Sequence, residues 1–293
     1  MAEHTIYKSD EGKQNILRFY ENYLNSFGFE MERAYVGTSF GRTHVLITGP
    51  KDGKPLFVFQ GGNCINPMTL SWFKPLFEHY RVYAPDTIGH PGYSAENRIS
   101  AKDDSFAHWI SELMTYFGVE KAAFAGPSYG AGILLRLAAS MPQKIACSVL
   151  ICPAGIALGS KFEMITKILV PLIIFKGTKS AVQLQKIADN MSDGFMKEID
   201  KEIIGSIFNY TKLEQDMPKL TEKRELLRYT APTIVIAGNK DVFFPEKKIG
   251  PAAKEIIPNL ANYEVFNMGH IPSEEQLVVI NEKIKEFLRL HYS

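Results

Sequence analysis

The sequence predicts an α/β protein whose mainly parallel sheet is covered by helices on both faces. Short runs rich in β-branched, aromatic and other apolar residues recur along the chain, and Gly, Pro, Asn or Asp closes them. After the first two runs, these candidate strands alternate with segments whose apolar residues recur at helical spacing. Such alternation favours parallel pairing, with the crossover helices packed on the faces of the sheet.

Eight segments have the pattern of a strand. They are residues 34–40, 43–49, 55–60, 80–85, 121–126, 145–152, 233–238 and 262–267. The first two are separated only by Gly41 and Arg42, and so short a link predicts an antiparallel hairpin. Three helices are expected over residues 103–117, 131–141 and 273–289. Asp103 and Ser273 stand at the start of the first and last, where short polar side chains cap free amides.

One long interval interrupts the alternation. Residues 153–232 are rich in helical patterns and contain no convincing strand. A structureless loop of that length is improbable, so we expect an inserted helical cap over residues 156–230. The core of this single domain then comprises residues 1–155 and 231–293. Within the insert, the apolar residues 168–175 are expected either to line a pocket or to pack between helices.

Charge and composition exclude several classes of function. The chain has 33 Lys and Arg against 32 Asp and Glu, so no overall field attracts nucleic acid or an anionic membrane. No apolar run approaches the roughly 20 residues that span a bilayer. The polar residues 1–15 lack a secretory signal, which favours a cytoplasmic location. The three cysteines, Cys64, Cys147 and Cys152, lack the spacing of a zinc site, and we expect no metal.

The strongest chemical signal is the stretch Gly126-Pro127-Ser128-Tyr129-Gly130. It matches G-x-S-x-G and lies between a predicted strand and a predicted helix, the context that a nucleophile elbow requires. The strands that follow it end at Asp241 and at His270, so a serine, an acid and a histidine occur in that order. Because the carboxyl ends of parallel strands meet at one crevice, we expect these three side chains to converge.

These residues resemble the motifs of the α/β-hydrolase fold family, over nearly the whole chain. Residues 38–62 and the length of 293 residues are most similar to bacterial carboxylesterases of the NP (naproxen-ester) type. The resemblance implies an eight-stranded sheet and a triad without a cofactor, with Ser128 as nucleophile, Asp241 as acid and His270 as base. It also implies an oxyanion hole formed by the backbone amides of Gly62 and Tyr129.

The loop after the third strand departs from the family pattern. Relatives usually have His-Gly where this chain has Gln60-Gly61, which leaves the anchoring of the loop open. Gln60 or Asn63 could instead supply a side-chain donor to the substrate. His90 follows the fourth strand and could reach the same crevice, whereas Asp86 is expected to shape its own loop.

Several aromatic residues flank these loops and could be pocket wall or core. They are Trp72, Phe73, Phe243 and Phe244. No cluster of Arg or Lys near the site marks an anion clamp, so a neutral, apolar ester is the favoured substrate. We therefore expect a serine carboxylesterase that acts on a small molecule. The same triad could serve a C–C hydrolase, an amidase or aminopeptidase, or a thioesterase, and the altered loop leaves open a ligand-binding or signalling protein with little turnover.

Overall fold

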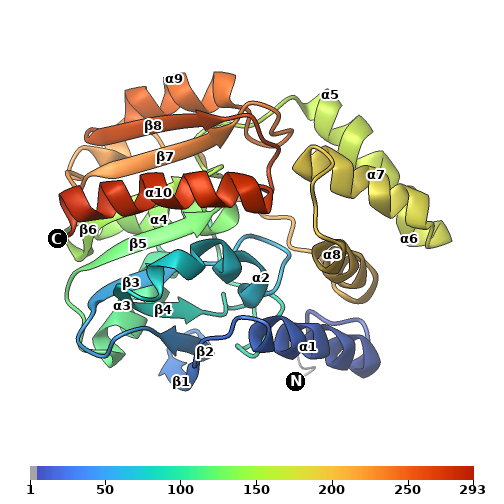
Figure 1. Ribbon diagram of the computed structural model, residues 1–293, viewed down its shortest axis with the longest axis horizontal. Coiled ribbons are helices and arrows are strands. Elements are labelled where there is room, and N and C mark those ends of the chain that lie inside the picture. Colours follow the sequence, from blue (N-terminus) through green and yellow to red (C-terminus); the bar gives the residue numbers. More distant parts are fainter. Residues whose placement is uncertain (1–4) are drawn as a thin grey trace.

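The computed structural model describes residues 5–293 and contains one eight-stranded sheet (Figure 1). Its strands are β1 (Glu32–Thr38), β2 (Gly41–Thr48), β3 (Lys54–Val58), β4 (Tyr80–Pro85), β5 (Ala122–Pro127), β6 (Ile145–Ile151), β7 (Thr233–Gly238) and β8 (Leu260–Phe266). They lie in the order β1-β2-β4-β3-β5-β6-β7-β8. The β1–β2 and β2–β4 pairs are antiparallel, and the other five pairs are parallel. All eight predicted strands are confirmed.

The first hairpin is confirmed, but its turn was placed wrongly. Thr38 pairs with Gly41 across the two strands, so the turn residues are Ser39 and Phe40 and not Gly41 and Arg42. Gly41 has a backbone φ of +119°, a conformation that glycine adopts at little cost. The glycine therefore begins β2 instead of forming the loop.

Helices cover both faces of the sheet. The α-helices are α1 (Asp10–Asn25), α2 (Asn66–Leu70), α3 (Ser105–Tyr116), α4 (Tyr129–Ser140), α5 (Lys161–Met164), α6 (Val170–Thr178), α7 (Ala181–Ser192), α8 (Glu198–Tyr210), α9 (Glu246–Ile256) and α10 (Glu274–His291). Short 3₁₀ turns cover Ser71–Leu76 (η1), Pro142–Lys144 (η2) and Lys223–Leu226 (η4), and Ile165–Leu169 (η3) is a π-helical turn. The three predicted helices correspond to α3, α4 and α10.

The two predicted helix caps have different outcomes. Ser273 is the N-cap of α10, where its side chain accepts a hydrogen bond from the Gln276 amide in a capping box. Asp103 is not an N-cap, because α3 begins one residue later than the prediction requires and Asp104 holds that position. The Asp103 carboxylate instead accepts a hydrogen bond from the Ser105 amide at 2.9 Å.

The core has two layers, one on each face of the sheet. Successive residues of β3 and the residue after it alternate between the layers: Leu56 and Val58 pack in one layer, Phe57 and Phe59 in the other. The first layer includes apolar side chains of α1 and α10, and the second includes those of α3, α4 and α9. Burial of both faces of the sheet explains why the central strands β5, β6 and β7 are nearly continuous apolar runs.

The segment α5–α8 is a helical insert between β6 and β7. Figure 1 shows it on the side of the sheet toward which the parallel strands point. The N-terminal part of the chain holds it there. Tyr7 forms an antiparallel bridge with Thr211, and Asn15 of α1 donates a hydrogen bond to the Ser206 hydroxyl of α8 at 2.8 Å. These contacts thus fasten the insert to the N-terminal part of the chain, in addition to its two connections with the sheet.

A buried carboxyl lies at this contact between α8 and the core. Asp200 is 3% exposed, and among the described residues its Oδ1 atom has no hydrogen-bond partner. Burial raises the pKa of Asp200 to about 6, against smaller opposite effects of the Tyr23 hydroxyl and the Lys197 charge. The folded pKa lies above the unfolded value, so protonated Asp200 stabilises the fold at low pH. That stability is lost as the pH rises through about 6.

We expect Asp200→Asn to stabilise the protein increasingly as the pH rises from about 4 to about 6, and by a constant amount above that. Asparagine stays neutral at every pH, so the free energy of unfolding at about pH 8 should rise by up to about 3 kcal/mol, with little change near pH 4. Urea denaturation at the two pH values measures the difference. Asp189→Asn, at an exposed position of the same insert, is the matched control. An equal gain at both pH values would contradict the titration of Asp200.

Candidate active site

Ser128 lies at a sharp turn between β5 and α4. Its φ and ψ are 51° and −116°, in a region that residues with a side chain seldom adopt. The Ser128 amide donates to the Ile151 carbonyl of β6 at 2.9 Å, and its carbonyl accepts from the Gly132 and Ala154 amides at 3.1 Å. Neighbouring structure therefore holds a strained backbone in place, as expected for a functional residue.

The two glycines of G-x-S-x-G are required by close backbone contacts. A Cβ atom on Gly126 would lie 2.9 Å from the Gly130 carbonyl carbon. A Cβ on Gly130 would lie 2.7 Å from the carbonyl oxygens of Phe59 and Gln60. Any side chain at either position would force the turn apart, so the motif has a steric cause.

Asp241 and His270 form a buried pair beyond the ends of β7 and β8. His270 Nδ1 lies 2.8 Å from Asp241 Oδ2, while Asp241 Oδ1 accepts hydrogen bonds from the Phe243 and Phe244 amides at 2.8 and 3.1 Å. Burial opposes ionisation, but the His270 charge and these hydrogen bonds together lower the pKa of Asp241. An ionised Asp241 directs the Nδ1 proton toward itself, which leaves Nε2 free to accept a proton.

The Asp241–His270 pair lies among aromatic rings and one thiol. The ring centroids of Phe243 and Phe244 lie 4.9 and 5.5 Å from that of His270. Donor atoms of Cys152, Asp241 and His270 lie within 4.8 Å of one another. A metal would need Cys152 as thiolate, but burial and the Asp241 charge raise the pKa of the Cys152 thiol well above its usual value. This group therefore favours a protonated thiol beside the carboxylate.

Ser128 and His270 line the same cavity, whose volume is about 240 Å³. Apolar side chains of the insert supply another part of its wall: Ile168, Leu172, Met191, Ile204 and Phe208. Among the hydrogen bonds of the described residues, none joins the Ser128 hydroxyl to His270. Contacts of this kind often tighten only when a substrate binds. The structure thus brings Ser128 and His270 to one cavity, and Asp241 contacts His270 without lining that cavity.

The predicted oxyanion residues, Gly62 and Tyr129, also line this cavity. Tyr129 is the first residue of α4, so its amide is one of those that a helix leaves without an internal partner. A Cβ on Gly62 would lie 3.1 Å from Tyr129 Cβ, so the two backbones approach closely. Gly62 and Tyr129 thus lie close together on the wall of the cavity that Ser128 also lines.

Gln60 anchors the loop after β3 and does not line the cavity. It is 1% exposed; its Nε2 donates to the Cys64 carbonyl at 2.8 Å, and its Oε1 accepts from the Thr87 amide at 3.0 Å. One side chain thus joins the loop after β3 to the loop after β4. The anchoring that the sequence left open is provided by an amide that can both donate and accept.

We expect Gln60→Ala to lower kcat about tenfold while KM changes little. The loop would lose both hydrogen bonds, so the Gly62 amide would no longer be held at the position of the oxyanion. The two lost partners should also lower the free energy of unfolding by about 1–3 kcal/mol. Steady-state kinetics and urea denaturation measure the effects. A fall in stability alone, with unchanged kcat, would show that Gln60 supports folding without positioning the amide.

The other two predicted pocket residues of these loops have different positions. Asn63 lines the cavity, and its side chain donates to the Glu214 carbonyl and accepts from the Glu214 amide at 3.0 and 2.7 Å. His90 does not line the cavity; its Nδ1 accepts from the Asn63 amide at 3.4 Å, and its ring lies 4.8 Å from that of Tyr129. Burial, with a smaller effect of Arg98, lowers the pKa of His90 to about 3. His90 therefore supports the loop as a neutral ring.

The remaining predicted residues divide between cavity and core. Phe243, Phe244 and Trp72 line the cavity, whereas Phe73 is fully buried in the core. Two further wall residues, Glu214 and Met217, were not predicted. Both follow α8 in an irregular segment that no periodic pattern marks.

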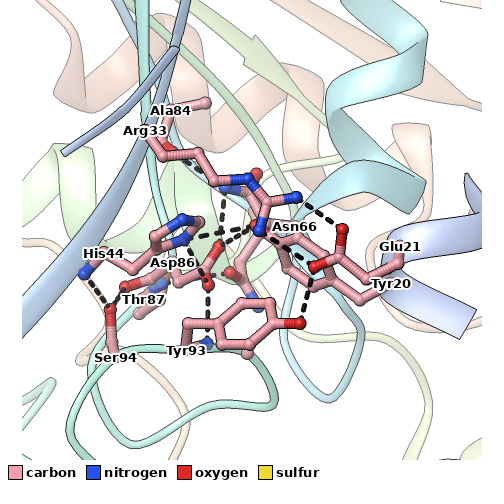
Figure 2. Close-up of polar contacts among 12 residues, drawn as sticks. Tyr20, Glu21, Arg33, His44, Asn66, Ala84, Asp86, Thr87, Tyr93 and Ser94 are labelled. Atoms are coloured by element: carbon pink, nitrogen blue, oxygen red, sulfur yellow. Dashed lines mark hydrogen bonds and ion pairs between the residues drawn. The ribbon is translucent and has the colours of Figure 1, made fainter. Parts of the chain in front are cut away.

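Asp86 is the centre of a buried hydrogen-bond network and is not a second acid of the candidate active site (Figure 2). It is fully buried, and its carboxylate accepts hydrogen bonds from the Tyr20 hydroxyl at 2.7 Å, the Asn66 amide group at 3.0 Å and the Tyr93 backbone amide at 2.8 Å. His44 Nδ1 lies 3.0 Å from its second oxygen. Figure 2 shows these groups converging on the carboxylate, which leaves no oxygen free for the cavity. The expectation that Asp86 shapes its own loop agrees with this network.

Comparisons with known proteins agree with this architecture. A family model described as alpha/beta hydrolase fold matches residues 54–277. Carboxylesterase YbfK of Bacillus subtilis is 26% identical over 281 residues, covering 93% of this chain and 94% of that protein. The uncharacterized carboxylesterase nap of the same organism is 24% identical over 284 residues, 94% of each chain. The crystal structure of naproxen esterase (carboxylesterase NP) from Bacillus subtilis superposes with a TM-score of 0.83 at 22% identity, over 96% of this chain and 99% of that one.

Proposed function

This chain belongs to the α/β-hydrolase fold family, and from that premise we propose that it is a serine carboxylesterase acting on small, neutral, apolar esters. The observation that carries the proposal is His270, which is joined to Asp241 at 2.8 Å and lines the same cavity as Ser128. The similarity to carboxylesterases of Bacillus subtilis at 24–26% identity supports the same class of reaction.

In the proposed mechanism, the Ser128 hydroxyl attacks the ester carbonyl carbon while His270 Nε2 takes its proton. The carbonyl oxygen becomes an oxyanion, which the Gly62 and Tyr129 amides stabilise. As the intermediate collapses, the bond to the alcohol breaks and His270 returns the proton to the leaving oxygen. Water then attacks the acyl-enzyme by the same route, which releases the carboxylic acid and restores Ser128.

The lining of the cavity supports an uncharged substrate. Among the described residues, those that line the cavity include no Lys or Arg, so the wall offers no cation to bind a carboxylate or phosphate of the substrate. The carboxylate of Glu214 is 3.1 Å from the Arg98 guanidinium, so this acid of the wall already has a partner. Most of the remaining wall is apolar, which favours an acyl or alcohol group without charge.

The proposal is tested by comparing the rates at which the protein cleaves an ester, an amide and a thioester bond to the same acyl group. Butyrate esters, butyryl anilides and butyryl thioesters of matched leaving groups present the same acyl chain to Ser128. We expect kcat/KM for the ester to exceed that for the anilide by roughly 100-fold, a difference of about 3 kcal/mol in transition-state free energy. A fluorophosphonate probe followed by peptide mass spectrometry should label Ser128.

The amidase, the thioesterase and the binding-protein alternatives each predict a different outcome of this experiment. Preference for the anilide would identify an amidase, and preference for the thioester a thioesterase. Labelling of Ser128 without turnover of any of the three would leave the triad intact but contradict the esterase assignment. Failure of the probe to label Ser128 would contradict the nucleophile itself and favour a binding protein.

A further inference from the structure

The helical insert exposes a group of large apolar side chains. They belong to the continuous helical segment formed by α5, η3 and α6, residues 161–178. Phe162 is 74% exposed and Ile173 60% exposed. We call the whole group the insert apolar surface, and its members are Phe162, Ile165, Leu169, Val170, Ile173 and Ile174. Single exposed apolar residues are ordinary, but a contiguous group on one helix usually marks an interaction surface.

The exposed residues follow the periodicity of one helix face. Phe162, Ile165, Leu169 and Ile173 are separated by three, four and four residues, so they form a stripe along the helix. The inward positions of the same segment are Ile168 and Leu172, which line the catalytic cavity, and Phe175, which is buried. The helix is therefore apolar on two sides, and packing within the protein accounts for only one of them.

Positive charge surrounds the insert apolar surface. Residues 161–192, from α5 to the end of α7, contain five lysines, all exposed, and two acids, Glu163 and Asp189. The lysines are Lys161, Lys167, Lys176, Lys179 and Lys186. Glu163 is paired with Lys167 at 3.0 Å, which leaves the remaining lysines as the dominant local charge. Exposed apolar side chains next to lysines are the composition of helices that lie in the headgroup region of a membrane.

We propose that the insert apolar surface docks this protein on an anionic lipid surface. The apolar stripe would enter the boundary between headgroups and acyl chains, while the lysines contact lipid phosphates. Within residues 5–293, no helix is long and apolar enough to cross a bilayer. The same helix contributes Ile168 and Leu172 to the cavity, and so its docked face lies directly behind the cavity wall.

Charge favours lipid over a second copy of this chain as the occupant. A twofold contact through this helix would bring the same patch of each subunit together and place lysines opposite lysines. Like charges at such a contact are unfavourable. An anionic lipid surface instead complements the five lysines.

Vesicle co-sedimentation of the full chain tests the proposal. Vesicles of pure phosphatidylglycerol and of pure phosphatidylcholine are compared in the absence of any ester, so the outcome does not depend on the reaction proposed above. We expect tighter binding to phosphatidylglycerol. Ile173→Glu should weaken it at least roughly tenfold because an apolar side chain leaves the lipid. Lys176→Gln should weaken it about fivefold on phosphatidylglycerol and leave phosphatidylcholine binding unchanged.

Leu290→Glu is the matched control, because Leu290 is 72% exposed on α10, outside the insert. It should bind vesicles as the wild type does. Light scattering coupled to gel filtration of wild type and Ile173→Glu measures oligomeric state in parallel. A dimer that Ile173→Glu dissociates, without vesicle binding, would assign the surface to a second copy and overturn the proposal. So would a monomer that binds neither vesicle, or vesicle binding that Ile173→Glu leaves unchanged.

Discussion

Ser128→Ala is expected to lower kcat/KM for p-nitrophenyl esters by about 10⁵ to 10⁶-fold. Removal of the hydroxyl removes the nucleophile, while the oxyanion amides and the cavity stay in place and account for any residual rate. The Ser128 backbone is fixed by hydrogen bonds of its own amide and carbonyl, so the turn should be unchanged in the variant. Steady-state kinetics on a short-chain ester measures the loss.

The strain at Ser128 adds a second expected result. Alanine inherits the φ of 51° and should leave the free energy of unfolding nearly unchanged, whereas Ser128→Gly should raise it by about 1–2 kcal/mol. Both variants should be inactive. A protein that becomes more stable as it loses activity is the signature of strain held for function.

Ser180→Ala is the control for the loss of a hydroxyl. Ser180 is the N-cap of α7, but its side chain makes no capping hydrogen bond there. The Ser180→Ala variant should therefore have the kcat/KM and the free energy of unfolding of the wild type. If Ser128→Ala retained more than about a hundredth of the activity, the nucleophile would have to be another group and the proposed mechanism would be wrong.

The fold was predictable because its signals are local. Strands β5, β6 and β7 are short apolar runs buried on both faces, and a Gly or Pro near the end of each stops the pattern. The elbow was predictable for the same reason, since strand, serine and helix are contiguous in sequence. Asp241 and His270 could be assigned only through chain order and the resemblance, because 29 residues separate them and their contact is tertiary.

Elements that depend on distant partners were missed. Helix α1 buries Ile16, Tyr20 and Tyr23, and two of these are tyrosines, which weaken an apolar pattern. The hydroxyl of Tyr20 donates a hydrogen bond to the carboxylate of Asp86, which lies 66 positions later in the chain. Gln60 could be seen as a departure from the family pattern, but its two partners, Cys64 and Thr87, could not be named. Tertiary hydrogen bonds have no sequence period, so pattern analysis cannot find them.

The insert shows the same distinction. Its helical character was predictable, and residues 168–175 were expected either to line a pocket or to pack between helices. Ile168 and Leu172 do line the cavity, but Ile173 and Ile174 are exposed. Hydrophobicity alone does not tell which side of a doubly apolar helix meets the protein. The neighbouring helices decide that, and they leave the second side uncovered.

Asp241→Asn is expected to lower kcat by about 10⁴-fold through the choice of imidazole tautomer. Wild-type Asp241 accepts the Phe243 and Phe244 amides on one oxygen and His270 Nδ1 on the other. Asparagine has a single acceptor oxygen. If that oxygen keeps the two backbone amides, its NH₂ group faces Nδ1 and donates to it. The imidazole proton then moves to Nε2, which can no longer take the proton of Ser128.

Asp241→Asn should also change the free energy of unfolding by an amount that depends on pH. The pKa of Asp241 is held below its usual range, so its ionised form stabilises the fold above the unfolded pKa. That contribution is lost as the pH falls through the folded value. The wild type should therefore be more stable than Asp241→Asn at neutral pH, and the difference should shrink below about pH 4. Urea denaturation across this range measures it.

Asp193→Asn is the control, since Asp193 is partly exposed and pairs with Lys240 on the adjacent loop. Surface pairs contribute little, so its activity and stability should remain close to the wild type. The tautomer argument also predicts that Asp241→Asn retains the fold and still binds substrate, so that kcat falls while KM changes little. A variant with kcat within about tenfold of the wild type would mean that a residue other than Asp241 orients His270. Cys152 would then be the residue to replace next, because its sulfur lies within 4.8 Å of the Asp241 carboxylate and the His270 ring nitrogen.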